Sequence, residues 1–301
     1  MSLPRQIGPF RIVRRLGVGA LGEVFLAIAY GASGFERRVA LKVLRPELEG
    51  DGEAERILLD EARTAARFEH RNLLGVHDAG AAQGRVWIRM DYLDAGDLAT
   101  RTAHAPLPEA LCLFVAHEIA LALAYLHTLR DDAGRPLGFV HRDISPNNIL
   151  VSQSGGVVLG DFGIAKSTLH REDTQSGVRK GKYAYMSPEQ VRGEPLTAAS
   201  DLFSLGVTLA ELLTGTRPFD AEGTLATMER IRDALPPAFP TLAPDLRDLL
   251  HNCLARAPSD RPASASVLCA SLARALSVRP PAGPLELGHW LRDHPLPEGS
   301  S

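Results

Sequence analysis

The sequence predicts an α+β protein with two lobes, a small β-rich lobe with one main helix and a larger, mainly helical lobe. Residues 10–45 alternate apolar and polar side chains between glycines, which is typical of strands. From Pro108 onward the apolar residues recur mainly with helical spacing. We place the small lobe at residues 1–93, the larger lobe at 94–276 and a flexible tail at 277–301.

The elements of the small lobe follow from the same pattern. Residues 53–68 contain few helix breakers and have helical spacing, so they predict its main helix. Three strands are predicted at residues 10–16, 23–28 and 38–44, and two more within 73–92, around a turn that contains glycine.

Long apolar-periodic segments predict the helices of the larger lobe, at residues 109–127, 201–214, 224–234, 244–255 and 263–276. Residues 140–190 are rich in loops, with short strands. The last segment, 277–301, contains five prolines, several glycines and polar residues, which is the composition of a partly disordered tail or tether. A docked segment around Trp290 is the alternative.

The composition is that of a globular protein with little net charge. The 301 residues are 45% hydrophobic and 23% charged, and the formal net charge is −3. There is no basic excess that would favour nucleic acid or an anionic membrane surface as a partner.

The cysteines and apolar runs predict a cytoplasmic protein. The three cysteines, Cys112, Cys253 and Cys269, lie far apart without metal-ligand spacing, so reduced thiols are expected. Arginines interrupt the first thirty residues, so we expect no signal peptide. The longest apolar stretch, residues 110–126, contains a histidine and a glutamate and predicts a buried helix, not a membrane span.

Lysine is scarce in this chain. Of the 33 lysines and arginines, four are lysines: Lys42, Lys166, Lys180 and Lys182. A GC-rich genome accounts for such a bias. Because the two cations are not interchangeable, a lysine that persists here is a candidate for a position that arginine would not serve.

Three glycines form a candidate phosphate-binding loop. Gly17, Gly19 and Gly22 precede Val24 in the pattern Gly-x-Gly-x-x-Gly-x-Val, and glycines let backbone N–H groups approach phosphates closely. A plain hairpin turn and a dinucleotide fold are the alternatives. The dinucleotide fold requires a helix directly after the glycines, whereas a strand-like run follows here.

Lys42 ends the run Val39-Ala-Leu-Lys42 on the next predicted strand. A lone strand lysine is usually solvated, but apolar residues flank this one on both sides. A cation here would hold the α- and β-phosphates of a nucleotide and would need a carboxylate to orient it. Glu61 on the following helix is the first candidate, and Asp60 is the second.

Three further motifs follow in order: His141-Arg-Asp143-Ile-Ser-Pro-Asn-Asn148, Asp161-Phe-Gly163 and Ser187-Pro-Glu189. With the glycine loop and Val-Ala-Leu-Lys, they resemble the protein kinase family, nearest to its eukaryotic-like (Hanks-type) bacterial Ser/Thr branch. The resemblance covers about residues 8–275. It implies the bilobal protein kinase fold and transfer of the γ-phosphate of Mg-ATP to Ser/Thr hydroxyls of proteins. The Ser-Pro-Glu element argues against a small-molecule kinase of related fold.

The resemblance also implies roles for single residues. Asp143 matches the base that accepts or orients the substrate hydroxyl, and Asn148 and Asp161 match the Mg²⁺ ligands. Around ATP, Val24, Ala40 and Leu150 match adenine contacts, and Met90 matches a back-pocket residue. Asp91 to Leu93 match the hinge, and Asp97 matches a ribose contact. The resemblance also implies two structural supports: Asp201 braces the catalytic loop, and Arg261 pairs with Glu189.

The chain departs from the family pattern at two positions. Most Ser/Thr kinases have a lysine two residues after the catalytic Asp and a threonine before the substrate-facing turn, where this chain has Ser145 and Lys182. In the family these two positions are neighbours in space. We therefore hypothesise that Lys182 supplies the missing charge; a surface lysine is the alternative. The departure leaves the choice between Ser/Thr and Tyr open, and a pseudokinase scaffold is the alternative function.

Arg142 matches an arginine that, in the family, often pairs with a phosphate on the activation segment. Thr174 and Ser176 lie in the middle of that segment and are the expected sites of autophosphorylation. A segment that is ordered without phosphate is the alternative.

Overall fold

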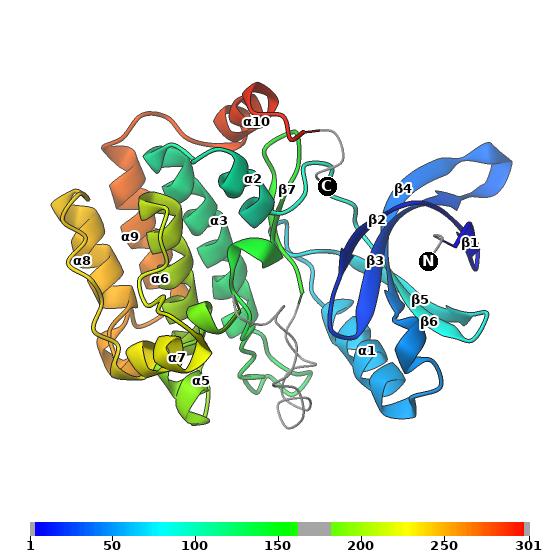
Figure 1. The fold of residues 1–301 in the computed structure, drawn as a ribbon, viewed down its shortest axis with the longest axis horizontal. Helices are drawn as coiled ribbons and strands as arrows, with labels where there is room; N and C mark the ends of the chain where they lie inside the picture. Colours follow the sequence, from blue (N-terminus) through cyan, green and yellow to red (C-terminus); the bar gives the residue numbers. More distant parts are fainter. Residues whose placement is uncertain (1–3, 162–181, 298–301) are drawn as a thin grey trace.

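The computed structural model describes residues 4–161 and 182–297, and its chain forms the two predicted lobes (Figure 1). The small lobe is an antiparallel six-stranded sheet in the order β1-β2-β3-β4-β6-β5, with helix α1 beside it. Its elements are β1 (Gln6–Ile7), β2 (Phe10–Val18), β3 (Gly22–Tyr30), β4 (Glu36–Leu44), α1 (Gly52–Ala65), β5 (Val76–Ala82) and β6 (Arg85–Met90). The predicted α+β class is confirmed.

Helix α1 begins and packs as its sequence predicts. The Asp51 side chain accepts hydrogen bonds from the backbone N–H groups of Glu53 and Ala54, which satisfies two donors at the helix start. Its buried residues recur every three or four positions, so one face of the helix packs on the sheet. That face comprises Ala54, Ile57, Leu58, Glu61, Ala62 and Ala65.

The larger lobe is built around α3, whose apolar side chains are buried on most of its circumference. Its elements are α2 (Leu98–His104), α3 (Glu109–His127), β7 (Ile149–Val151), β8 (Val157–Leu159), α5 (Pro188–Arg192), α6 (Ala198–Thr214), α7 (Thr224–Asp233), α8 (Pro244–Cys253), α9 (Ala265–Ser277) and α10 (Pro284–Asp293). By length and composition α3 could cross a membrane, but 67% of its most apolar window is buried in the fold, as in a core helix.

The predicted flexible tail is wrong for residues 284–293, which form helix α10. Leu287, Trp290 and Leu291 lie three and four positions apart, share one face of the helix, and are buried in the core of the larger lobe. Pro284 stands at the start of this helix, where its missing N–H costs nothing. The proline and glycine content of the segment obscured this short apolar face.

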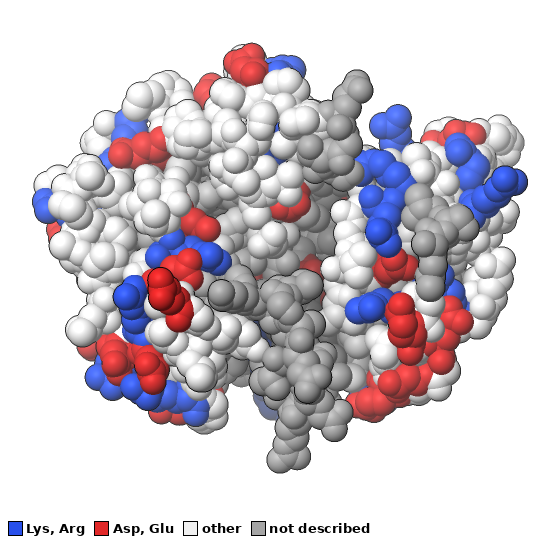
Figure 2. Space-filling view, viewed as in Figure 1, with Lys and Arg blue, Asp and Glu red and all other residues white. Residues whose placement is uncertain are grey.

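The charged side chains of the small lobe are divided between two sides. Figure 2 shows mainly basic side chains over its upper part and mainly acidic side chains over its lower part. The exposed arginines of β2 and β4 include Arg11, Arg15, Arg37 and Arg38, whereas η2 (Pro46–Leu48) and α1 carry Glu47, Glu53 and Asp60. Over the larger lobe, the two signs are mixed on the face drawn.

Candidate active site

The centre of the candidate site is Lys42 on β4, which contacts two carboxylates. Its Nζ lies 2.8 Å from Glu61 Oε1 on α1 and 3.3 Å from Asp161 Oδ1, which follows β8. Burial by itself disfavours the charged lysine, but Asp161 and Glu61 outweigh it, so the pKa of Lys42 is raised above its usual value. Lys42 therefore carries a positive charge at neutral pH.

Glu61, rather than Asp60, is the partner of Lys42. Glu61 lies on the buried face of α1, whereas Asp60 lies one position away on the helix surface. There the Asp60 carboxylate pairs with Arg56 at 3.1 Å and with Arg63 at 2.9 Å. The helical period therefore decides between the two acids.

The loop 141–148 is held from inside the larger lobe. Asp201 on α6 accepts hydrogen bonds from the backbone N–H groups of His141 and Arg142, both at 2.8 Å. Within the loop, Asn148 Nδ2 donates to the Asp143 carbonyl oxygen at 2.7 Å. Arg142 has a φ of 70°, in the left-handed region that few non-glycine residues adopt. These bonds position the buried Asp143 and Asn148 together.

His127 is a supporting residue that the sequence did not reveal. Its Nε2 lies 2.9 Å from Asp201 Oδ2, and both side chains are buried. The two residues are 74 positions apart, and no local motif surrounds His127. Only the packing of α3 beside α6 brings them together.

Strand pairing assembles the side chains predicted to contact a nucleotide. Val24 lies opposite Lys42 across β3 and β4, and Ala40 lies opposite Met90 across β4 and β6. Leu150 lies on β7. A small pocket beside Lys42 is lined by Lys42, Glu61, Ala62, Ala65, Leu74, Val76, Ile88, Met90 and Asp161. Met90 therefore lines the same pocket as Lys42 and Glu61.

The predicted hinge and ribose contact lie between the lobes. Asp91 directs its carboxylate toward His77, 2.7 Å away, and Leu93 packs against the apolar cluster of the small lobe. Asp97 caps α2, because its carboxylate accepts hydrogen bonds from Thr100 N at 2.8 Å and Thr100 Oγ1 at 2.9 Å. Asp97 also forms an isolated β-bridge with Leu150.

The glycine loop is the tip of the β2–β3 hairpin. Gly19 N donates to Gly22 O at 2.7 Å, and strand β3 follows directly, so the helix of a dinucleotide fold is absent from this described segment. A Cβ at Gly22 would lie 3.0 Å from the Val43 carbonyl oxygen. Glycine therefore allows close approach of the loop to β4, whereas a Cβ at Gly17 would meet open space.

Several predicted residues lie outside the described part of the chain. Phe162, Gly163, Thr174 and Ser176 belong to residues 162–181. Lys182 begins the short helix η6 (Lys182–Tyr185), but its side chain is not among those described. Ser145 is described, and its Oγ is buried without a hydrogen-bond partner among residues 4–161 and 182–297.

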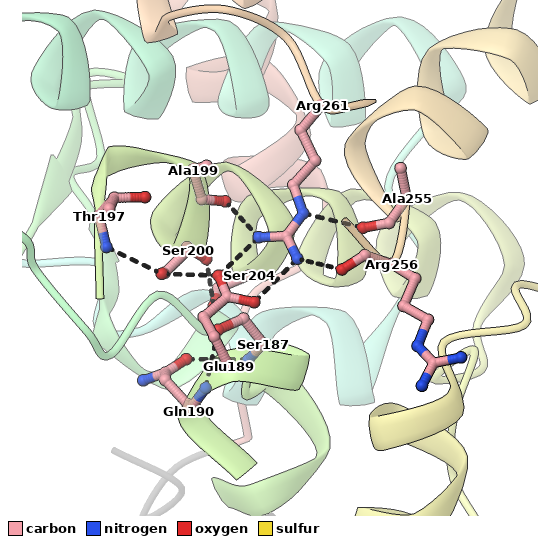
Figure 3. A network of polar contacts seen from close by, with 10 residues as sticks. All are labelled: Ser187, Glu189, Gln190, Thr197, Ala199, Ser200, Ser204, Ala255, Arg256 and Arg261. Carbon is pink, nitrogen blue, oxygen red and sulfur yellow. Dashed lines mark hydrogen bonds and ion pairs between the residues drawn. The ribbon is translucent and has the colours of Figure 1, made fainter. Parts of the chain in front are cut away.

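The buried pair Glu189–Arg261 links α5 to the segment before α9 (Figure 3). Arg261 donates from both terminal nitrogens to the two Glu189 oxygens, at 2.6 and 2.9 Å. Ser200 Oγ donates to the same carboxylate at 2.7 Å. Burial alone would raise the pKa of Glu189, but the bonds from Arg261 and Ser200 hold that pKa below its usual value.

Comparison with known proteins places this geometry in a family. The protein kinase domain model matches residues 10–272. The chain is 38% identical to the tyrosine-protein kinase MasK of Myxococcus xanthus over 98% of its own length, and 34% identical to the serine/threonine-protein kinase PknA of Mycobacterium tuberculosis over 92%. It spans 47% of MasK and 63% of PknA.

A solved structure supports the same assignment. The crystal structure of the PknI kinase domain of Mycobacterium tuberculosis superposes with a TM-score of 0.64 at 30% sequence identity, covering 91% of this chain and 99% of that one. The likeness spans both lobes, and the relatives include several bacterial serine/threonine-protein kinases. The chain belongs to the protein kinase family, in its Hanks-type bacterial branch, and is a protein kinase domain.

Proposed function

We propose that this domain transfers the γ-phosphate of ATP to serine and threonine hydroxyls of proteins. The observation that carries the proposal is the buried Lys42, held by Glu61 and lying 3.3 Å from Asp161. Phosphoryl transfer needs charge neutralisation and in-line positioning more than covalent chemistry. A fixed, fully charged lysine beside an acidic residue can supply this charge neutralisation and positioning.

The residues present fit a magnesium ion. The Asp161 side chain is 56% exposed, so its carboxylate remains accessible to a cation while it contacts Lys42. Asn148 uses its amide nitrogen for the Asp143 carbonyl, which leaves the amide oxygen as an acceptor. Hard oxygen ligands of these two kinds suit Mg²⁺. When bound, Mg²⁺ would neutralise phosphate charge.

We assign the other residues the roles that the resemblance to protein kinases implies. Lys42 holds the α- and β-phosphates, and the backbone of Gly17, Gly19 and Gly22 covers them. Asp143 accepts or orients the proton of the attacking hydroxyl. Val24, Ala40 and Leu150 would contact the adenine ring, backbone groups of Asp91 to Leu93 would bind it, and Asp97 would contact the ribose.

Asp143→Asn tests this function directly. We expect phosphate transfer from γ-labelled ATP to a generic basic protein to fall by about a thousandfold, because the amide cannot accept the hydroxyl proton. ATP binding should persist, since the asparagine keeps the size of the side chain. Equal transfer by the parent and the variant would contradict the assigned base. ATP binding without transfer by the parent would instead favour a pseudokinase.

Tyrosine specificity is the second candidate, because the similar protein MasK is named a tyrosine-protein kinase and Ser145 replaces the usual lysine. Analysis of the phosphorylated amino acids in the same reaction decides between the two. Phosphoserine and phosphothreonine support the proposal, and phosphotyrosine alone overturns it.

We also propose that Lys182 replaces the missing lysine at Ser145. The buried Ser145 Oγ, without a partner in the described residues, leaves this part of the loop short of a polar contact. Lys182→Ala should lower the turnover number by at least about tenfold, because a positive charge near the transferred phosphate is lost. Lys182→Arg keeps the charge, and Ser145→Lys should partly rescue Lys182→Ala. Normal turnover of Lys182→Ala would end the idea.

Regulation by phosphorylation is proposed from Arg142, whose Nε is buried without a hydrogen-bond partner in the described residues. A phosphate on Thr174 or Ser176 would pair with this guanidinium and order the activation segment. Phosphopeptide mapping of the reaction above locates the modified residue.

We place the activity in the cytoplasm, because Cys112, Cys253 and Cys269 are all free and buried.

A further inference from the structure

Helix α10 contacts the β7–β8 turn and α2, and β7 carries Leu150 of the proposed ATP site. In Figure 1 it lies above α2 and beside β7. A Cβ at Gly155, in the β7–β8 turn, would lie 1.8 Å from the Pro284 carbonyl oxygen, and Gly155 has a φ of 83°. A Cβ at Gly288 would lie 3.0 Å from the Gln153 carbonyl oxygen. Glycines on both sides therefore allow the helix and the turn to touch.

Polar contacts join the end of α10 to α2. Arg101 of α2 is buried, and its Nη1 donates to the His294 carbonyl oxygen at 3.3 Å. Its Nε donates to the Ala95 carbonyl oxygen at 2.7 Å. One guanidinium therefore connects the end of α10 to the segment that follows the proposed hinge.

That segment, residues 94–97, is also bonded to β7 and its turn. Ala95 N donates to Val151 O at 3.2 Å, and Val151 N donates to Gly96 O at 2.9 Å. Asp94 Oδ1 accepts a hydrogen bond from Gln153 N at 2.8 Å. Helix α10 therefore contacts both structures that hold this segment, the β7–β8 turn and Arg101. Val151, which is bonded to the segment, directly follows Leu150 of the proposed ATP site.

We propose that α10 is a positioning element for ATP, acting through Arg101 and the β7–β8 turn on residues 91–97. The proposal rests on the function proposed above, because it concerns the affinity of that ATP site. Loss of the Arg101 bond would leave the buried Ala95 carbonyl without its donor and loosen the segment that carries Asp97. The effect falls on nucleotide affinity, because none of the residues that α10 contacts is assigned to the transfer step.

Arg101→Ala in the 301-residue chain provides the test. We expect the Kd for Mg-ATP, measured by calorimetry, and the KM for ATP to rise by about tenfold, with kcat at saturating ATP within about twofold of the parent. Arg101→Lys keeps one donor, so its Kd and KM for ATP should lie between those of the parent and those of Arg101→Ala. Arg274→Ala, on the exposed side of α9, and Leu285→Ala, exposed on α10, are matched controls that should keep the parental values.

Gly288→Ala is the second variant, because its Cβ presses on the Gln153 carbonyl without altering Arg101. A rise in Kd for this variant as well supports positioning by the whole helix. A lower melting temperature with parental Kd and KM in both variants would show that α10 is merely structural and overturns the proposal. If Arg101→Ala does not fold, Gly288→Ala alone decides. Because Kd is measured without turnover, a parent that binds ATP but transfers no phosphate overturns the proposed function and not this inference.

Discussion

Replacing Lys42 with methionine should lower the turnover number of phosphate transfer by about a hundredfold to a thousandfold, because a fixed positive charge at the phosphates is lost. Methionine keeps much of the length of the lysine stem, so the flanking apolar residues of β4 remain packed. Steady-state assays with γ-labelled ATP measure the loss, and circular dichroism checks that the variant is folded.

The matched control for Lys42→Met is Arg63→Met, which removes an exposed cation from the same lobe. Arg63 pairs with Asp60 on the outer face of α1, so activity should stay at the parental level. Parental turnover of Lys42→Met would contradict the assignment of Lys42.

The raised pKa of Lys42 also predicts how its contribution to the stability of the fold depends on pH. That contribution is fully present below the ordinary pKa of 10.5 and is lost only as pH rises through the higher folded pKa.

Arg261→Ala should destabilise the domain by about 3–5 kcal/mol, because it leaves the Glu189 carboxylate buried without its charged partner. The side chains of Arg261 and Glu189 are 0% and 3% exposed, so water cannot replace the lost bonds. Arg261 also donates to the carbonyl oxygens of Ala199 and Ala255, both at 2.9 Å. Urea unfolding at neutral pH measures the change.

The pH dependence of this loss has a definite sign. The folded pKa of Glu189 lies below its ordinary value of 4.5, so its contribution to stability is present above that value and is lost as pH falls through the folded pKa. The difference between the parent and Arg261→Ala should therefore shrink in acid. Arg192→Ala is the control, because its pair with Glu194 is partly exposed and should contribute less than about 1 kcal/mol. A loss as small for Arg261→Ala would contradict the structural role.

Sequence reasoning could predict the residues of the candidate site because their pattern depends on residue types in a fixed order. The spacing of Asp143 and Asn148 within one loop, and the position of Lys42 on a strand after the glycines, were visible without coordinates. Helix periodicity also located most long helices, with α3 at Glu109–His127 as predicted. Strand β1 and the short helices α2 and α5 were missed, because such brief segments carry little periodic signal.

The sequence by itself determined the family, the two lobes and the identity of the polar residues around the proposed phosphates, since local pattern and residue chemistry are enough for these. Only the tertiary structure decided that Glu61 and not Asp60 meets Lys42, that His127 supports Asp201, and that α10 docks on the β7–β8 turn. Each of these outcomes depends on which faces of distant segments meet. Burial of a few apolar side chains, such as Leu287 and Leu291, outweighs a proline-rich composition only when a matching surface exists elsewhere in the fold.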